Sequence, residues 1–172
     1  KKWAATNGYD SNKISFTGHS LGGGIASVMS LWFNRPSTTF AEAPFEFTAT
    51  SNSNIGLVNA TFVAKGMFDS DFAAFTAANL LPVNPLLYAR QALVTNYYNQ
   101  GEFLNYLRFE TNTVFNTSTA IDIGDQPISR ALELHSMNLH AAFLFDDRLR
   151  VLAKSMPELI PALLDKTLYH SD

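Results

Sequence analysis

The chain has 172 residues, of which 47% are hydrophobic, and its formal net charge at pH 7 is −3. This length suits one domain with its own core, and the mild negative charge argues against nucleic acid as a main partner. The sequence contains no cysteine, which excludes a disulfide framework, a thiolate metal site and a cysteine nucleophile.

The first predicted elements flank a tight turn that is rich in glycine. Apolar side chains alternate over residues 13–17, which predicts a strand, and recur at helical spacing over residues 25–33. Between them stands Gly18-His19-Ser20-Leu21-Gly22, and G-x-S-x-G between a strand and a helix is typical of a nucleophile elbow. We therefore predict that Ser20 is a nucleophile with a positive φ, and that Gly18 and Gly22 are needed as small neighbours. The alternative is a glycine-rich turn before an ordinary helix.

The helix that follows Ser20 is predicted to stabilise negative charge at the elbow. Its first backbone N–H groups and the positive end of its dipole would point toward an oxyanion formed at Ser20. The N–H of Leu21, the residue after the nucleophile, is therefore the expected oxyanion-hole donor.

Little of the chain precedes this elbow. Only the end of a helix, over residues 1–7, is predicted before the strand at 13–17, whereas an elbow lies on a central strand with several parallel strands before it. We expect residues 1–172 to be the C-terminal portion of a single α/β-hydrolase domain, with the N-terminal half and the second oxyanion donor supplied from elsewhere. The alternative is a minimal sheet with an exposed edge.

Two further strands are predicted downstream, over residues 37–41 and 93–98. Helices between them complete an α/β fold, which we predict to be a partial α/β-hydrolase fold of parallel strands with flanking helices. Residues 110–126 are rich in Thr and Asn and are predicted to form a loop, anchored inward by Ile121 and Ile123.

A segment between these strands has two open interpretations. Apolar residues, many of them phenylalanine, fill residues 55–81 before Pro82 and Pro85 interrupt the pattern. Residues 55–90 are predicted either to form a mobile cap that accepts acyl chains or to pack as part of the hydrolase body.

A serine hydroxyl needs a base within hydrogen-bond reach, and imidazole is the side chain best suited to this role. His19 adjoins Ser20 but would point to another side of the turn, where packing or loop support explains it, and His170 lies in a polar tail. His135 precedes Ser136, a good helix N-cap, so it would lie on a loop, whereas His140 would lie inside the helix. We predict that His135 is the base.

The third member of such a site is a carboxylate that orients the imidazole. Glu102 and Glu42 each follow a predicted strand, where ligand sites of parallel sheets lie. Asp122 and Asp125 stand in the loop before His135, where solubility and turn formation explain them more simply. We favour Glu102, and Glu42 and Asp122 remain alternatives.

Four stretches resemble lipase-type α/β-hydrolases, the class 3 lipases among them. Residues 18–23, GHSLGG, resemble the serine motif, and residues 39–44 are similar to the next strand, which ends in Ala-Pro. Residues 94–102 resemble the strand that ends in the family's acid, usually Asp and here Glu102. Residues 134–139 resemble the histidine segment of hydrolase domains in large bacterial secreted proteins. The resemblance implies Ser20, His135 and Glu102 as a catalytic triad, and a secreted bacterial protein.

These inferences predict a serine carboxylic-ester hydrolase, similar to lipases and esterases, that works through an acyl-enzyme. The alternatives are an acyltransferase or thioesterase with the same triad, and a truncated hydrolase-like module without activity. The expected partners are a small ester or lipid and, transiently, a lipid interface. We expect no cofactor and no metal.

Overall fold

The computed structural model of the chain describes residues 6–8, 10, 13–110 and 118–164. Within these residues, four parallel strands form one sheet in the order β1-β2-β3-β4. The strands are β1 (Phe16–His19), β2 (Ser37–Phe40), β3 (Val94–Asn99) and β4 (Ser118–Ile121). Helices flank this sheet, so the predicted α/β fold is confirmed. The helix end predicted over residues 1–7 falls almost entirely outside the described residues.

Strand β4 lies within the stretch that the sequence predicts to be a loop. Its Ser118 pairs with Asn96 of β3, and Ile121 is its one buried residue. In these four residues only one side chain is buried, so the alternation of apolar and polar residues is too short to predict a strand. The predicted inward anchors are confirmed, because Ile121 and Ile123 are both buried.

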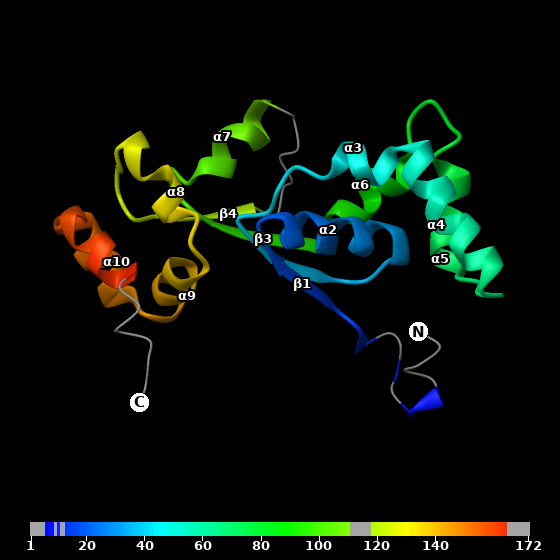
Figure 1. Cartoon of the computed structure of the whole chain (residues 1–172), viewed down its shortest axis with the longest axis horizontal. Coiled ribbons are helices and arrows are strands. Elements are labelled where there is room, and N and C mark those ends of the chain that lie inside the picture. Colours follow the sequence, from blue (N-terminus) through cyan, green and yellow to red (C-terminus); the bar gives the residue numbers. More distant parts are fainter. Residues whose placement is uncertain (1–5, 9, 11–12, 111–117, 165–172) are drawn as a thin grey trace.

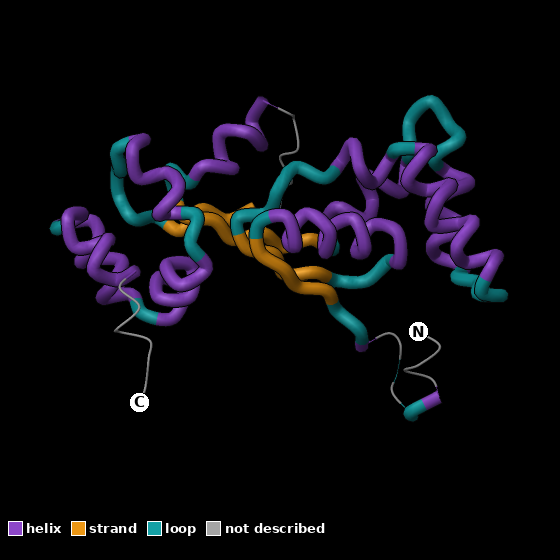
Figure 2. Tube along the Cα trace, in the orientation of Figure 1, coloured by secondary structure: helices purple, strands orange, loops and turns teal. Residues whose placement is uncertain are grey.

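The helices form groups on either side of helix α2 (Leu21–Phe33), as Figures 1 and 2 show. One group consists of α3 (Glu46–Thr50), α4 (Asn52–Ala64), α5 (Ser70–Ala78) and α6 (Pro85–Gln91). Toward the other end lie α7 (Phe103–Glu110), α8 (Ala131–Leu134), α9 (Met137–Phe145) and α10 (Asp147–Ser155). Two 3₁₀ helices, η2 (Ile128–Arg130) and η3 (Pro157–Leu164), complete this second group. No helix in the described part of the chain is both long and apolar enough to cross a membrane.

Helix α2 shares a hydrophobic core with the first group of helices. Trp32 of α2 packs edge-on against Phe72 of α5, with 5.4 Å between the ring centroids, and Phe75 is fully buried nearby. The indole N–H of Trp32 also donates to the carbonyl of Ala49 at 2.9 Å. In this conformation α5 therefore packs against the body, and the opening of residues 55–90 as a cap stays a prediction.

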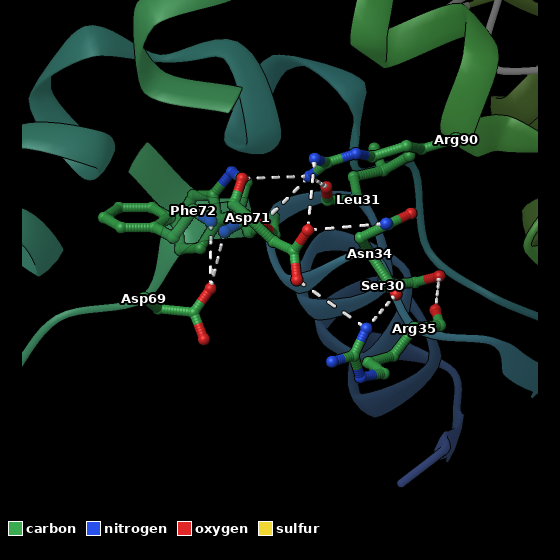
Figure 3. A network of polar contacts seen from close by, with 9 residues as sticks. Ser30, Leu31, Asn34, Arg35, Asp69, Asp71, Phe72 and Arg90 are labelled. Carbon is green, nitrogen blue, oxygen red and sulfur yellow. Dashed lines mark hydrogen bonds and ion pairs between the residues drawn. The ribbon is translucent and has the colours of Figure 1, made fainter. Parts of the chain in front are cut away.

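A buried arginine fixes the C-terminal end of α2 (Figure 3). Nη1 of Arg90 donates to the carbonyls of Leu31 and Trp32 at 2.6 and 3.1 Å, which satisfies backbone acceptors at the helix end. The carboxylate of Asp71 lies between Arg90 and Arg35, at 3.9 and 3.7 Å. This network ties α2 to α5 and α6, so the helix that carries the elbow is anchored at its far end.

A second core forms around β4, α9, α10 and η3. Its fully buried members include Leu134 and Leu139, which stand on either side of His135 in the sequence. Because these two leucines are fixed in the core, the loop between α8 and α9 is held at both ends.

Candidate active site

Ser20 lies on the turn between β1 and α2 with φ 56° and ψ −125°. A positive φ at a non-glycine residue costs about 1 to 3 kcal/mol and recurs at functional sites. The backbone around it holds this geometry, since Ser20 N–H donates to the carbonyl of Phe40 and the N–H of Ala43 donates to the carbonyl of Ser20, both at 3.0 Å. The predicted positive φ is confirmed.

The two outer glycines of the motif have different environments. A Cβ on Gly18 would collide with the backbone carbonyl of Gly22, so position 18 accepts only glycine. A Cβ on Gly22 would meet nothing within 4 Å. The expected need for a small residue is therefore confirmed at Gly18 and wrong at Gly22. Close packing falls instead on Gly23 and Gly24, where a Cβ would lie 3.0 Å from Glu42 and 2.9 Å from the carbonyl of Ala43.

The structure brings Ser20, His135 and Glu102 into one hydrogen-bonded row. Nε2 of His135 lies 2.8 Å from the hydroxyl oxygen of Ser20. Nδ1 of the same ring lies 2.8 Å from Oε2 of Glu102. With the proton on Nδ1, the ring donates to the carboxylate and accepts the serine hydroxyl proton, which is the tautomer that a general base requires.

Glu102 lies in the turn after β3, as the sequence predicts for the acid. Its side chain is fully buried, and Oε2 also accepts the backbone N–H of Leu104 at 2.9 Å. The backbone N–H of Glu102 donates to the carbonyl of Asn99 at 3.1 Å. A carboxylate held by its own turn in this way orients the imidazole that it contacts.

The other carboxylates lie in different surroundings. Glu42 is fully buried beneath the elbow, where its Oε2 accepts the hydroxyls of Ser27 and Thr39 at 2.5 and 2.8 Å. Asp122 is exposed and pairs with Lys154 at 2.6 Å, which lowers the pKa of this carboxyl. Asp125 is exposed as well. Among the described residues, the carboxylate in hydrogen-bond contact with His135 is Glu102.

Among the described residues, neither the His19 ring nor the His140 ring is hydrogen-bonded to Ser20. Nε2 of His19 donates to the backbone carbonyl of His135 at 2.7 Å, and burial is the main cause that lowers the pKa of His19. His140 lies in α9, fully buried, and burial lowers its pKa to about 4. His170 lies outside the described residues. His135 occupies the predicted loop, with Ser136 at the N-cap position of α9.

The start of α2 provides backbone donors beside Ser20. Leu21 is its first residue, and the first N–H groups of a helix have no acceptor within the helix. An oxyanion formed at Ser20 would therefore face the positive end of the α2 dipole.

An apolar groove of about 220 Å³ begins beside the elbow. One wall is formed by α2, from Leu21 and Ile25 to the buried Trp32, and the other consists of Pro44 and Phe45 after β2. Leu21, the residue after Ser20, lines this groove, whereas Ser20, His135 and Glu102 are not among its lining residues. Within the described residues, no cluster of three or more His, Asp or Glu side chains could hold a metal ion.

Sequence reasoning missed one residue of this region, Asn99. It ends β3 with its side chain buried, and its Nδ2 donates to the carbonyl of Leu134 at 2.8 Å. A polar residue at the carboxyl end of a parallel strand, two positions before a glycine, is the signal that could have found it.

A parallel sheet with a serine at a strand-to-helix turn, aligned with a histidine and a buried acid, defines the α/β-hydrolase class of protein. A family model of phospholipase-like proteins, the Tle-like phospholipase domain, matches residues 1–143. The chain therefore belongs to this family of lipase- and phospholipase-type hydrolases, and the match does not single out class 3 lipases within that type. Searches of curated proteins and of solved structures give no match.

Proposed function

We propose that this protein hydrolyses carboxylic esters of lipids, phospholipids among them, through a serine acyl-enzyme. The observation that carries the proposal is the position of the His135 ring, which lies 2.8 Å from both Ser20 Oγ and Glu102 Oε2. A hydroxyl is a weak nucleophile until a base takes its proton, and this contact supports such a transfer.

The proposed reaction has two halves. Ser20 Oγ attacks the ester carbonyl carbon while His135 Nε2 takes the hydroxyl proton, and the Leu21 N–H donates to the resulting oxyanion. His135 then returns its proton to the leaving alkoxide as the carbon–oxygen bond breaks, which leaves the acyl group on Ser20. In the second half, water attacks the acyl-enzyme, its proton passes through His135 to Ser20 Oγ, and the free acid departs.

Glu102 has two roles in this scheme. Its carboxylate keeps the His135 proton on Nδ1, and it stabilises the imidazolium that forms in each half-reaction. Burial strengthens this second effect, because charge–charge interactions grow as water is removed.

The apolar groove supports a substrate with an acyl chain. Its lining along α2 is apolar and includes Leu21, the residue after Ser20. We propose that an acyl chain binds along this wall while its ester carbonyl reaches Ser20. A volume of about 220 Å³ lies below the roughly 300 to 1,000 Å³ of drug-sized sites, which suits a single chain.

The test is release of fatty acid from phosphatidylcholine vesicles and from a soluble p-nitrophenyl ester. We expect the protein to release free acid from both, and the Ser20→Ala variant to release none. Folded protein that releases no more acid than Ser20→Ala would contradict the proposal. Product formed only when an alcohol or thiol acceptor is added would instead assign an acyltransferase with the same residues.

A further inference from the structure

Three consecutive backbone carbonyls around His135 each accept a hydrogen bond from a side chain. These carbonyls belong to residues 134–136. The amide Nδ2 of Asn99 donates to the first of them, the carbonyl of Leu134, at 2.8 Å. Nε2 of His19 lies 2.7 Å from the second, which belongs to His135 itself, and Nδ1 of His140 lies 2.8 Å from the third. The backbone of this loop is therefore held at three successive positions.

Two of the three donors come from the sheet. His19 is the last residue of β1 and Asn99 is the last residue of β3, so both stand where strands end. Their positions are set by the strand pairing and not by the loop. These contacts therefore fix the position of the His135 backbone relative to the carboxyl ends of the strands.

Each of the two histidine rings can carry its proton on the nitrogen that faces a loop carbonyl. The Nε2 atom of His140 accepts the backbone N–H of Asn99 at 3.3 Å, which leaves the proton on Nδ1 for the carbonyl of Ser136. His19 donates through Nε2, and its ring lies beside that of His135, tilted by 37° with 4.8 Å between the ring centroids.

We propose that His19 is a positioning residue of the active site. Its Nε2–H bond to the carbonyl of His135 holds the imidazole where its two nitrogens meet Ser20 and Glu102. This inference rests on the proposed function, because it concerns the geometry of the same base. Asn99 and His140 hold the carbonyls on either side, so the loop stays folded when the central bond is lost.

Two matched variants separate the hydrogen bond from the packing of the ring. His19→Phe keeps an aromatic ring beside His135 but has no donor, whereas His19→Gln lacks the ring but has an amide N–H that can reach the carbonyl. Because misplacement of a reacting group by about 1 Å costs about 100-fold, we expect kcat of His19→Phe to fall about 10- to 100-fold while KM stays within about twofold. We expect His19→Gln to stay within about threefold of the wild type.

Thr17→Val, at an exposed position of the same strand, is the control and should leave kcat unchanged. If His19→Phe does not fold, His19→Met provides the same loss of a donor without a ring. Unchanged kcat in the folded donor-less variant, or an equal loss in His19→Gln, would overturn the proposal.

Crystal structures of His19→Phe, or His19→Met in its place, and of His19→Gln separate this inference from the proposed function. In the donor-less variant we expect His135 Nε2 to move out of hydrogen-bond distance of Ser20 Oγ, and in the Gln variant to remain within it. This readout needs no activity. A wild type that releases no acid therefore contradicts the function, and an unmoved His135 ring in the donor-less variant contradicts the positioning role.

Discussion

The Nε2 atom of His135 lies 2.8 Å from the hydroxyl oxygen of Ser20, although 115 positions separate the two residues in the chain. The other ring nitrogen lies equally close to Glu102, so one imidazole joins a strand-to-helix turn to the turn after β3. The order of these residues along the chain, serine, acid and histidine, is that of α/β-hydrolases.

The first prediction concerns the acid. Glu102→Gln keeps the side-chain shape but removes the charge that keeps the His135 proton on Nδ1, so we expect kcat for a p-nitrophenyl ester to fall about 1,000- to 10,000-fold. Glu42→Gln is the matched control, because Glu42 is also fully buried but bonds to Ser27 and Thr39. It should lower the free energy of unfolding by about 1 to 3 kcal/mol with kcat of the folded protein little changed. Loss of kcat in Glu42→Gln alone would contradict the assignment.

The second prediction concerns the glycines of the elbow. Gly18→Ala would drive a Cβ into the backbone carbonyl of Gly22, and neither backbone segment can move freely. We therefore expect the free energy of unfolding to fall by at least about 3 kcal/mol. Gly22→Ala meets open space within α2, so its free energy of unfolding should be unchanged or higher by up to about 1 kcal/mol. Urea denaturation measures the free energy of unfolding of both variants. An equal loss in the two would contradict the claim that position 18 accepts only glycine.

The third prediction concerns pH. Burial lowers the pKa of His140 from 6.5 to about 4, so between these values the unfolded chain binds a proton that the folded chain does not. This group's contribution to stability is complete above pH 6.5 and is lost as pH falls toward 4. The loss is about 2 kcal/mol between pH 6.5 and 5.

The measurement is urea denaturation of the wild type and His140→Gln at pH 7.5 and 5. Because Gln does not titrate, the fall in the free energy of unfolding should be about 2 kcal/mol smaller in the variant. An identical fall in both proteins would mean that His140 does not carry this pH dependence.

The fourth prediction concerns the acyl groove. Ile25→Ser removes apolar surface from the wall next to Leu21, and each buried CH₂ contributes about 0.8 kcal/mol. We expect kcat/KM for an octanoyl ester to fall about tenfold while that for an acetyl ester stays the same, since only the longer chain reaches this wall. Val151→Ser, an exposed apolar position on α10 outside the groove, should change neither value. Equal losses for both esters would place the acyl chain elsewhere.

The sequence was most informative where a chemical requirement leaves few residue types. The positive φ of Ser20 and the exclusion of any Cβ at Gly18 both follow from the tight turn between β1 and α2. The positions of Glu102 after β3 and His135 before Ser136 could be inferred because strand ends and helix N-caps have recognisable local signals.

Features that depend on tertiary contacts were not predictable from local patterns. Strand β4 exists because Ser118 to Ile121 pair with β3, and its own alternation is too short to indicate a strand. The role of Asn99 depends on a hydrogen bond to Leu134, 35 positions away in the sequence. The tolerance at Gly22 depends on the empty space beside α2, which no spacing of residues reveals.

The central claim is that Ser20 is the nucleophile. Reaction of the protein with a fluorophosphonate probe, followed by mass analysis of its peptides, tests this claim most directly, because the probe traps an activated serine covalently. We predict one modified residue, Ser20, with labelling abolished in Ser20→Ala and strongly slowed in His135→Ala. Well-folded protein that remains unlabelled, or that is labelled at another residue, would contradict the account.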